Sequence, residues 1–322
     1  MAPSRAAWWT GTALACLVET MTGAGAGADR DEPMRGILLL LAALTIFSVS
    51  DAIAKKLGQT LPAVEIAWLR YLAFLALTLL ATARRGGAGL FRSRAPGLQL
   101  LRGLGVAGSA IAFIMALQHL PLAEATAINF VSPAFVTALS VLVLAERVGW
   151  RRWSAIAVGM LGMLVIVRPG SDLFTPAARL PVCSSAAWAC AVVVTRRIGT
   201  VDPPATTLIW TAGIGFIVMS LLLPVTIAFR GGIVMPDATE AGLGLLIGLF
   251  SSFAQWLVVL AYRIAPASTL APFAYMQLLT SGLLGVVMFG ALPDRWTLIG
   301  AAVITASGLY TAHRERVRSR MR

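Results

Sequence analysis

The sequence is built from apolar runs that are long enough to cross a lipid bilayer as helices. Ten such runs follow one another, at residues 36–54, 62–82, 97–117, 122–145, 150–167, 178–196, 204–226, 240–262, 266–289 and 295–313. Only 12% of the residues are charged, whereas a soluble domain carries about 25%, so the chain has too few charges to cover a water-facing surface. Lipid allows only helices or closed barrels, and unbroken apolar runs do not alternate as barrel strands do. We therefore predict an all-α membrane protein with ten transmembrane helices.

The positions of the basic residues predict the orientation of the helices. If the N-terminus is cytoplasmic, nineteen of the 26 Lys and Arg side chains lie on the inner side and six on the outer side, with Arg70 inside a span. Cytoplasmic loops of membrane proteins carry such an excess of positive charge. We expect both termini in the cytoplasm and the protein in the cell (inner) membrane. Because the basic residues stand at the ends of apolar runs, the net charge of +12 indicates topology and contact with the lipid bilayer, with no nucleic-acid partner.

The two ends of the chain differ from the segment between them. Residues 1–33 contain an apolar stretch of about 13 residues, too short to span a bilayer, followed by a Gly/Ala-rich and then acidic stretch. We expect this extension to be disordered. Because the sequence MRGILLLL opens the first span directly, a further hypothesis is that translation starts at Met34. The basic tail at 314–322 is expected to lie at the cytoplasmic face against anionic lipid.

The chain contains an internal repeat with a shift of 145 residues. The stretch Ala116–Glu146 returns in a weaker form at Ala261–Ala291. Under the same shift, identical residues coincide within and beside this stretch, namely Gly103 with Gly248, Ala116 with Ala261, and Pro121 with Pro266. We assign residues 34–168 to a first repeat and 169–313 to a second, each with five spans. Because five is odd, the second repeat crosses the membrane upside down relative to the first, an arrangement from which many secondary transporters build a midplane site.

Four segments carry a resemblance to a known family. They are ALQHLPLAEATAINFVSPAF (116–135), AERVGWRRWSAIAVGMLG (145–162), RIAPASTLAPFAYMQ (263–277) and DRWTLIGAAVITASGLY (294–310). They resemble the two repeats of an EamA-type member of the drug/metabolite transporter superfamily, and the resemblance covers residues 34–313. It implies ten helices, cytoplasmic termini and a central cavity lined mainly by helices from the middle of each repeat.

The resemblance has one departure and one finer indication. The family often has Gly-Glu at the end of the fourth helix of each repeat, but this chain has Ala145-Glu146 in the first and Gly290-Ala291 in the second. Any role of that acid is therefore present once. The pair Asp51 and Lys55, together with the segment APFAYMQ, is most similar to family members that move S-adenosylmethionine or riboflavin.

Polar side chains at membrane depth are the candidates for a solute-binding site. The predicted substrate-binding set is Arg70, Asn129, Ser132, Gln255, Trp256, Tyr275 and Gln277. Arg70 lies about 12 Å along its helix from Pro62, at 1.5 Å per residue, too deep to reach outer water. We expect it to face the bundle interior and to bind an anionic group of the solute or, as an equal alternative, to pair with Glu65 or Asp51. For the other members, packing or hydrogen bonds between helices are the alternatives.

Three acids are candidates for ion coupling or ion pairing: Asp51, Glu65 and Glu124. Asp51 is either functional or paired with Lys55, one helical turn later, at headgroup level. Glu124 either lies near outer water or faces the cavity, where it would carry a coupling proton. Pro133 and Pro272 stand inside spans, and we expect each to kink its helix and free a backbone carbonyl.

These features predict a secondary transporter that moves small organic metabolites by alternating access. The solute would be amino-acid-like, nucleoside-like or vitamin-like, and the protein a monomer or homodimer. The sequence contains no Walker-type loop, so ATP is not the expected driver. We predict no catalytic residue, cofactor or metal ion. Ion coupling and simple facilitated flux both stay open. The alternatives from other classes are an integral-membrane enzyme and a non-transporting membrane sensor or assembly subunit.

Overall fold

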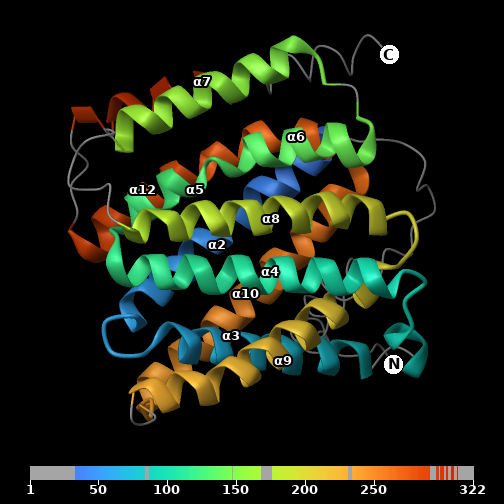
Figure 1. The fold of residues 1–322 in the computed structure, drawn as a ribbon, viewed down its shortest axis with the longest axis vertical. Coiled ribbons are helices and arrows are strands. Elements are labelled where there is room, and N and C mark those ends of the chain that lie inside the picture. Colours follow the sequence, from blue (N-terminus) through green and yellow to red (C-terminus); the bar gives the residue numbers. More distant parts are fainter. Residues whose placement is uncertain are drawn as a thin grey trace, which may run out of the picture.

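The computed structural model describes residues 33–83, 87–146, 148–167, 176–230 and 234–290, with short pieces between 295 and 310. Within these residues every regular element is a helix, as predicted. The long helices lie side by side and run across the view of Figure 1. They are α2 (Pro33–Leu57), α3 (Ala63–Ala83), α4 (Pro96–His119), α7 (Trp150–Val167), α8 (Arg179–Ile198), α9 (Pro204–Arg230) and α10 (Ala238–Ile264). Two short 3-10 helices, η1 (Gly87–Phe91) and η2 (Pro176–Ala178), precede α4 and α8.

The described part of the chain crosses a membrane many times. Seven helical stretches are long and apolar enough to span, namely Pro33–Leu57, Ala63–Thr82, Pro96–His119, Ala125–Leu144, Pro176–Ile198, Pro204–Phe229 and Ala238–Ile264. Two shorter apolar helices accompany them, at Trp153–Val165 within α7 and at Met276–Phe289. The prediction of an all-α, multi-pass membrane protein is confirmed for these residues. The tenth predicted span, 295–313, falls largely outside the described residues, and the segments 1–32 and 314–322 fall wholly outside them.

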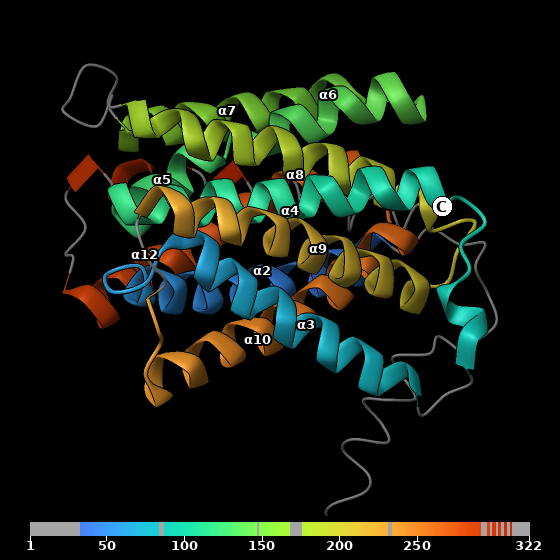
Figure 2. The same cartoon turned by 60° about the horizontal axis from the view of Figure 1, so that its bottom comes forward.

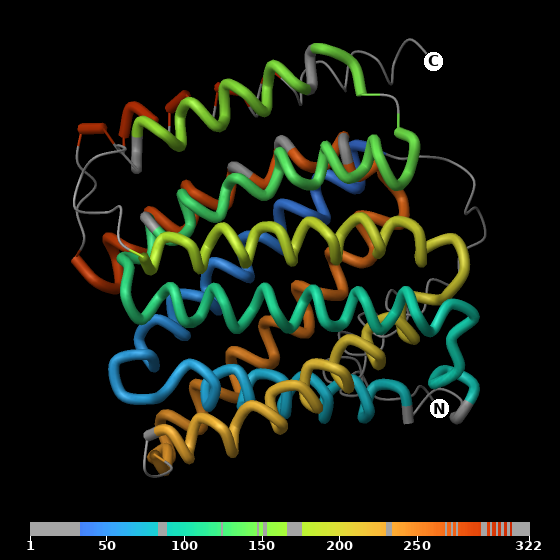
Figure 3. The backbone as a smooth tube through the Cα atoms, in the orientation of Figure 1, coloured from blue at the N-terminus to red at the C-terminus, as the bar shows by residue number. Residues whose placement is uncertain are grey.

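Two of the predicted spans are broken into shorter helices. The span predicted at 122–145 consists of α5 (Leu122–Asn129) and α6 (Ser132–Leu144), and Figure 3 follows the backbone through the break. Pro133 causes it, because proline has no N–H for the carbonyl four residues earlier and its ring crowds that carbonyl. The freed carbonyl is that of Asn129, which accepts a hydrogen bond of 3.0 Å from the Ser185 hydroxyl. The expected kink with a freed carbonyl is confirmed here.

The second broken span is the repeat-related image of the first. It consists of α11 (Ala267–Leu270), the 3-10 helix η3 (Ala271–Tyr275) and α12 (Met276–Phe289). Pro272 lies in η3, where the tighter 3-10 winding replaces the α-helix. Both repeats therefore carry a discontinuous fourth helix with irregular backbone beside its proline. In lipid such backbone is tolerated only where it is covered by protein or lines a cavity.

The two repeats pack against each other through matched pairs of helices. Under the repeat shift α2 corresponds to α8, α3 to α9, α4 to α10 and α6 to α12. The packed pairs obey this correspondence: α4 on α8 is matched by α10 on α2, α4 on α9 by α10 on α3, and α6 on α8 by α12 on α2. Figures 1 and 2 both show α4 beside α8. Each of these pairs joins one repeat to the other, so the core of the protein is the interface between the repeats.

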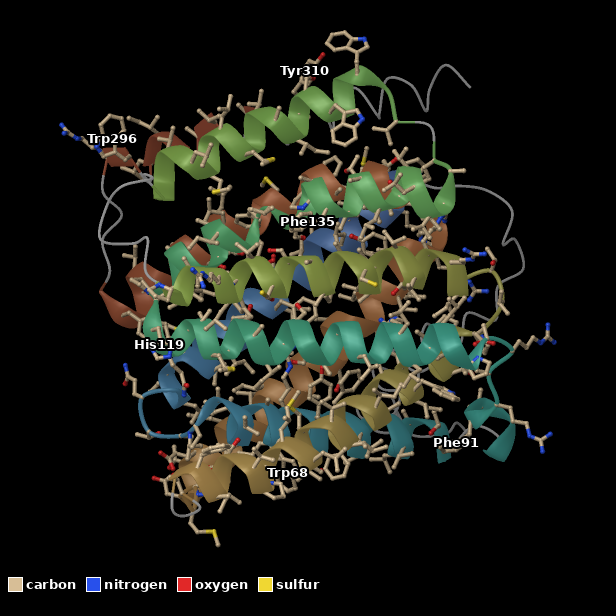
Figure 4. The ribbon with its side chains drawn as sticks, viewed as in Figure 1. Trp68, Phe91, His119, Phe135, Trp296 and Tyr310 are labelled. Carbon is tan, nitrogen blue, oxygen red and sulfur yellow. The ribbon has the colours of Figure 1, made fainter. Side chains whose placement is uncertain are left out.

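The ends of the helices show that the repeats are inverted. Lys55, near the end of α2, donates to the carbonyl of Leu120, just after α4. Asp202, just after α8, accepts hydrogen bonds from Ser93 and from the backbone of Arg94, just before α4. The first helices of the two repeats, α2 and α8, therefore finish at opposite ends of the bundle. We name these ends the Lys55 end and the Asp202 end; Figure 4 labels His119 at the former and Phe91 at the latter.

Candidate solute-binding cavity

A cavity of about 80 Å³ lies between the two repeats, about halfway along the helices. Ser109, in the middle of α4, is part of its wall. The polar lining side chains come from both repeats and are Asp51, Arg70, Ser109, Asn129, Ser132, Ser184, Gln255 and Gln277. The aromatic lining side chains are Phe47, Phe113, Phe130 and Trp188. The structure thus brings together five members of the predicted substrate-binding set, namely Arg70, Asn129, Ser132, Gln255 and Gln277.

The burial of Arg70 is energetically costly, because this side chain carries a charge and is only 6% exposed. A close approach of two helices places it there: a Cβ on Gly248 of α10 would lie 2.7 Å from the Arg70 carbonyl oxygen, so only glycine fits. Its guanidinium lies 5.9 Å from the centre of the Phe47 ring. Within the described residues it donates no hydrogen bond and forms no direct ion pair, although Asp51 lies in the same wall and acts on it electrostatically. A buried charge in this situation is available to a solute.

Asn129 and Ser132 reach the cavity from the break between α5 and α6. The Ser185 hydroxyl of α8 lies 3.1 Å from the Asn129 side-chain oxygen, besides its contact with the Asn129 carbonyl. Ser132 is buried at the first position of α6. Asn129 and Ser132 are three residues apart, so they lie on roughly one face, and both side chains line the cavity on either side of the break at Pro133.

Gln255 and Gln277 reach the cavity from the second repeat, on α10 and α12. Gln255 is almost fully buried and its side-chain oxygen accepts a hydrogen bond of 3.2 Å from Arg102 of α4. Gln277 is partly exposed at the beginning of α12, next to η3. Asn129 and Gln277 thus supply amide groups from beside the broken helix of each repeat, and Gln255 supplies one from α10, which packs across the interface.

Arg102 is a buried charged residue that the predicted substrate-binding set does not include. It is one of the nineteen basic residues that the charge pattern counts on the inner side, but its side chain does not reach water, since it is only 1% exposed. Its guanidinium donates to hydroxyls of Thr195 on α8 and Thr211 on α9 as well as to Gln255 on α10. Arg102 lies less than two turns into α4, so sequence position alone could not separate a surface arginine from one that turns inward.

The other predicted residues do not gather at the cavity. Trp256 is 5% exposed and packs with its ring centre 5.4 Å from that of Phe253, outside the cavity lining. Glu65 is buried near the beginning of α3, where one carboxylate oxygen accepts from the backbone of Val234 at 3.4 Å. Tyr275 lies in η3 and Glu124 in α5, but their side chains lie outside the described part of the structure. The expectations for these two therefore stay predictions.

Lys55 has a role that the sequence did not reveal. Its ammonium group donates to the carbonyls of Leu117 and Leu120, at 3.2 and 2.9 Å. These are among the last carbonyls of α4, which carry the negative end of the helix dipole. A lysine is favourable at that position because it supplies hydrogen bonds and positive charge together.

Asp202 organises the surface at its end of the bundle. Its carboxylate accepts from the Ser93 hydroxyl, from the Arg94 backbone at 2.9 Å and from the Gln99 side chain at 2.9 Å. Burial alone would raise the pKa of Asp202. The three hydrogen bonds and the charge of Arg94 lower it by more than burial raises it, so the pKa lies below the ordinary value. Asp202 is therefore held as a carboxylate, and it ties the beginning of α4 to the loop between α8 and α9.

A polar cavity between two inverted helical repeats is typical of multi-pass secondary transporters. The sequence profile of the EamA-like transporter family matches residues 34–168 and again residues 177–311. The chain belongs to the EamA-like transporter family, as the resemblance of its four segments predicted. Because the two matched regions correspond to one profile, they also confirm the two-repeat organisation.

Several named proteins are similar to the chain over most of its length. A riboflavin transporter of Rhizobium johnstonii is 31% identical, and the match covers 90% of this chain and 95% of the relative. An S-adenosylmethionine uptake transporter of Rickettsia prowazekii is 25% identical, with 88% and 94% covered. A solved crystal structure has a TM-score of 0.69 to this chain and 21% identity, with 87% of this chain and 96% of that chain covered, and it supports the fold. The prediction of a transporter of small organic metabolites is confirmed.

Proposed function

We propose that the protein carries a vitamin-like or nucleoside-like metabolite by alternating access, with riboflavin as the first candidate. The observation that supports this most strongly is Arg70, a buried guanidinium that faces the cavity without a hydrogen-bonding partner among the described residues. Leaving such a charge unpaired is costly unless a ligand satisfies it in another state. In this proposal Arg70, Asn129, Ser132, Gln255 and Gln277 bind the solute.

The aromatic wall of the cavity favours a flat solute. Phe47 and Trp188 lie edge to face, with ring centres 5.9 Å apart, and Phe113 and Phe130 also line the space. Aromatic side chains pack well against a planar conjugated ring. Riboflavin has such a ring with carbonyl groups on its edge, which suit the donors of Arg70. The riboflavin transporter among the relatives supports the same choice.

Asp51 favours a second candidate. Its carboxylate lies in the same wall as Arg70, so the cavity holds one negative and one positive charge. S-adenosylmethionine also carries both signs, with a carboxylate beside an ammonium and a sulfonium, and its adenine ring is flat. The S-adenosylmethionine uptake transporter among the relatives supports this alternative. A further role for Asp51, Glu65 or Glu124 in ion coupling belongs to the same proposal.

The volume of the cavity indicates which step of transport the structure represents. About 80 Å³ holds several water molecules, whereas pockets for drug-sized ligands have about 300–1,000 Å³. The structure is therefore a contracted form in which no vitamin-sized solute fits. Rocking of one repeat against the other would widen the cavity toward one side of the membrane. We propose that the Asp202 end faces the cytoplasm of the cell and that the solute is released chemically unchanged.

Purified full-length protein in liposomes tests the proposed function. We expect it to move labelled riboflavin into or out of the vesicles, with S-adenosylmethionine as the second solute. Arg70→Met should reduce the initial rate at least tenfold, while Arg70→Lys, which keeps the charge, should retain more activity. Arg197→Met is the matched control, because it also removes a guanidinium, but from a residue that is exposed at the end of α8. Unchanged flux in Arg70→Met, or chemical conversion of the solute, would contradict the proposal.

A further inference from the structure

The hydrogen bonds around Arg102 have a defined direction. Thr195 and Thr211 each have a single hydroxyl proton, and each donates it to its own helix, to the carbonyls of Ala191 at 2.6 Å and Thr207 at 2.7 Å. Their oxygens are therefore left to accept from Arg102, which donates through Nε to Thr195 and through Nη1 to Thr211. The guanidinium is therefore fixed by hydrogen bonds to α8 and α9, independently of its bond to Gln255.

This fixed guanidinium determines which way the Gln255 amide points. Arginine has only donors, so the amide atom that lies 3.2 Å from Arg102 Nη2 must be the oxygen. The nitrogen is then on the other arm of the amide, away from Arg102. Gln255 lines the cavity, and within the described residues its amide nitrogen donates to no other group. The amide therefore presents an N–H donor, and not its oxygen, to the cavity.

We propose that Arg102 fixes the Gln255 amide with its nitrogen toward the cavity, so that the cavity selects solutes presenting a carbonyl or carboxylate oxygen. This inference rests on the proposed function and adds the substrate class that the site accepts. Arg102 is a positioning residue, since it acts through Gln255 and lies outside the cavity lining.

A second donor strengthens the selection. Arg70 on α3 supplies N–H groups to the same cavity as Gln255 on α10. A solute with two acceptors on one edge would accept hydrogen bonds from both Arg70 and Gln255. A solute that presents an amine there would leave these two buried donors facing the N–H donors of the amine. Sites built to hydrogen-bond a substrate group reject analogues that lack it strongly, because their buried polar groups stay unpaired. Flavin carbonyls and the carboxylate of an amino acid share the required chemistry.

Binding to detergent-purified full-length protein tests the inference. The probes are riboflavin, S-adenosylmethionine and one matched pair of small aromatic solutes, benzoate and benzylamine. Gln255→Glu replaces the donor by a carboxylate oxygen of nearly the same shape, and we expect it to weaken binding of riboflavin and benzoate at least tenfold. Arg102→Met frees the amide to rotate and should remove the preference for benzoate over benzylamine, while Arg102→Lys, which keeps a donor for the amide oxygen, should retain it.

The controls separate this inference from stability and from the proposed function. Ser251→Ala changes the same buried face of α10 one turn earlier, outside the cavity lining, and should leave every affinity within threefold. Melting temperatures of all variants show whether each is folded. Wild-type protein that binds benzoate but neither riboflavin nor S-adenosylmethionine refutes the proposed solutes and supports the inference. Equal binding of benzoate and benzylamine, unchanged affinity in Gln255→Glu, or wild-type protein that binds none of the probes overturns it.

Discussion

The two ends of the bundle are built alike and held together differently. At the Lys55 end, Lys55 of the first repeat donates to the last carbonyls of α4. At the Asp202 end, Arg196 of the second repeat donates to the carbonyl of Arg263, at 2.9 Å, near the end of α10. A basic residue near the end of the first helix thus binds the end of the third helix in each repeat. Each of these contacts stays within its own repeat, so each stabilises a half without joining the halves.

The described contacts between the repeats differ in kind at the two ends of the bundle. At the Asp202 end, Asp202 binds the segment before α4, the Glu146 carboxylate accepts from the backbone of Ala267 at 3.1 Å, and the Trp210 indole donates to the carbonyl of Phe91 at 3.1 Å. Arg102 adds its bonds to three helices of the second repeat less than two turns further in. At the Lys55 end the described contacts across the interface include the Trp68 indole, which donates to the Ser220 hydroxyl at 3.0 Å, and a bond of 3.4 Å to Glu65. Lys55 also approaches the Phe289 ring, at 5.9 Å.

This difference teaches which end resists opening in the described conformation. Alternating access requires the repeats to separate at one end at a time. Separation at the Asp202 end breaks several hydrogen bonds to charged groups, each worth about 1.5–3 kcal/mol. Separation at the Lys55 end breaks the bonds of Glu65 and Trp68 instead. The Asp202 end is therefore held closed by charged groups in the described conformation, and substitutions there should change both stability and access to the cavity.

The largest effect is expected from Asp202→Ala. The substitution removes the acceptor of three hydrogen bonds and leaves the buried Gln99 side chain without its partner on Asp202. We expect the free energy of unfolding to fall by about 3 kcal/mol. The measurement is thermal unfolding in detergent, combined with maleimide labelling of a cysteine placed at Ser109 in the cavity. Labelling from the Asp202 side should become faster. A variant with unchanged stability and unchanged labelling would show that Asp202 does not hold this end closed.

The stabilisation from Asp202 should also depend on pH. Its pKa is below the ordinary value in the folded protein, so the folded state favours the carboxylate more than the unfolded state does. The contribution is complete above the unfolded pKa, about 3.9, and is lost as the pH falls through the folded pKa. The difference in melting temperature between wild type and Asp202→Asn should be constant from about pH 8 to 5 and shrink below about pH 4. A difference that grows on acidification would contradict this sign.

A smaller effect is expected from Glu146→Ala, which tests the contact that only one end has. Glu146 accepts from the N-terminal backbone of α11, and the corresponding pair in the second repeat is Gly290-Ala291, without an acid. Loss of this acceptor should lower the free energy of unfolding by about 2 kcal/mol and speed labelling from the Asp202 side. Glu146→Gln keeps an oxygen for the backbone of Ala267 and is the control. If both variants behave as wild type, the single acid does not contribute to closure.

The helices and their breaks could be predicted from the sequence, because apolar length and proline act locally. Pro133 lacks its N–H in any surroundings, and Arg70 lies deep in a span in any packing of the helices. The partners of Arg102 could not be predicted, since Thr195, Thr211 and Gln255 are brought to it only by tertiary packing.

The same limit explains why two neighbours on α10 have different positions. Gln255 and Trp256 are adjacent, so their side chains point about 100° apart around the helix. Gln255 lines the cavity, whereas Trp256 packs outside it. In a helix that is apolar on every side, the sequence does not show which face meets the other repeat, and both residues were therefore assigned to the site.

The smallest effect is expected from a matched pair at the ends of the two fourth helices. Ala145 and Gly290 are separated by the repeat shift of 145 residues, and both have left-handed backbone, with φ of 53° and 64°. A side chain costs about 1–2 kcal/mol in this conformation, and a Cβ on Gly290 would meet no atom within 4 Å, so the cost there is that of the backbone alone. Ala145→Gly should raise the free energy of unfolding by about 0.5–1 kcal/mol and Gly290→Ala should lower it by about 1 kcal/mol. Thermal unfolding measures both, and shifts of the same sign would show that the two helix ends are not equivalent in the folded protein.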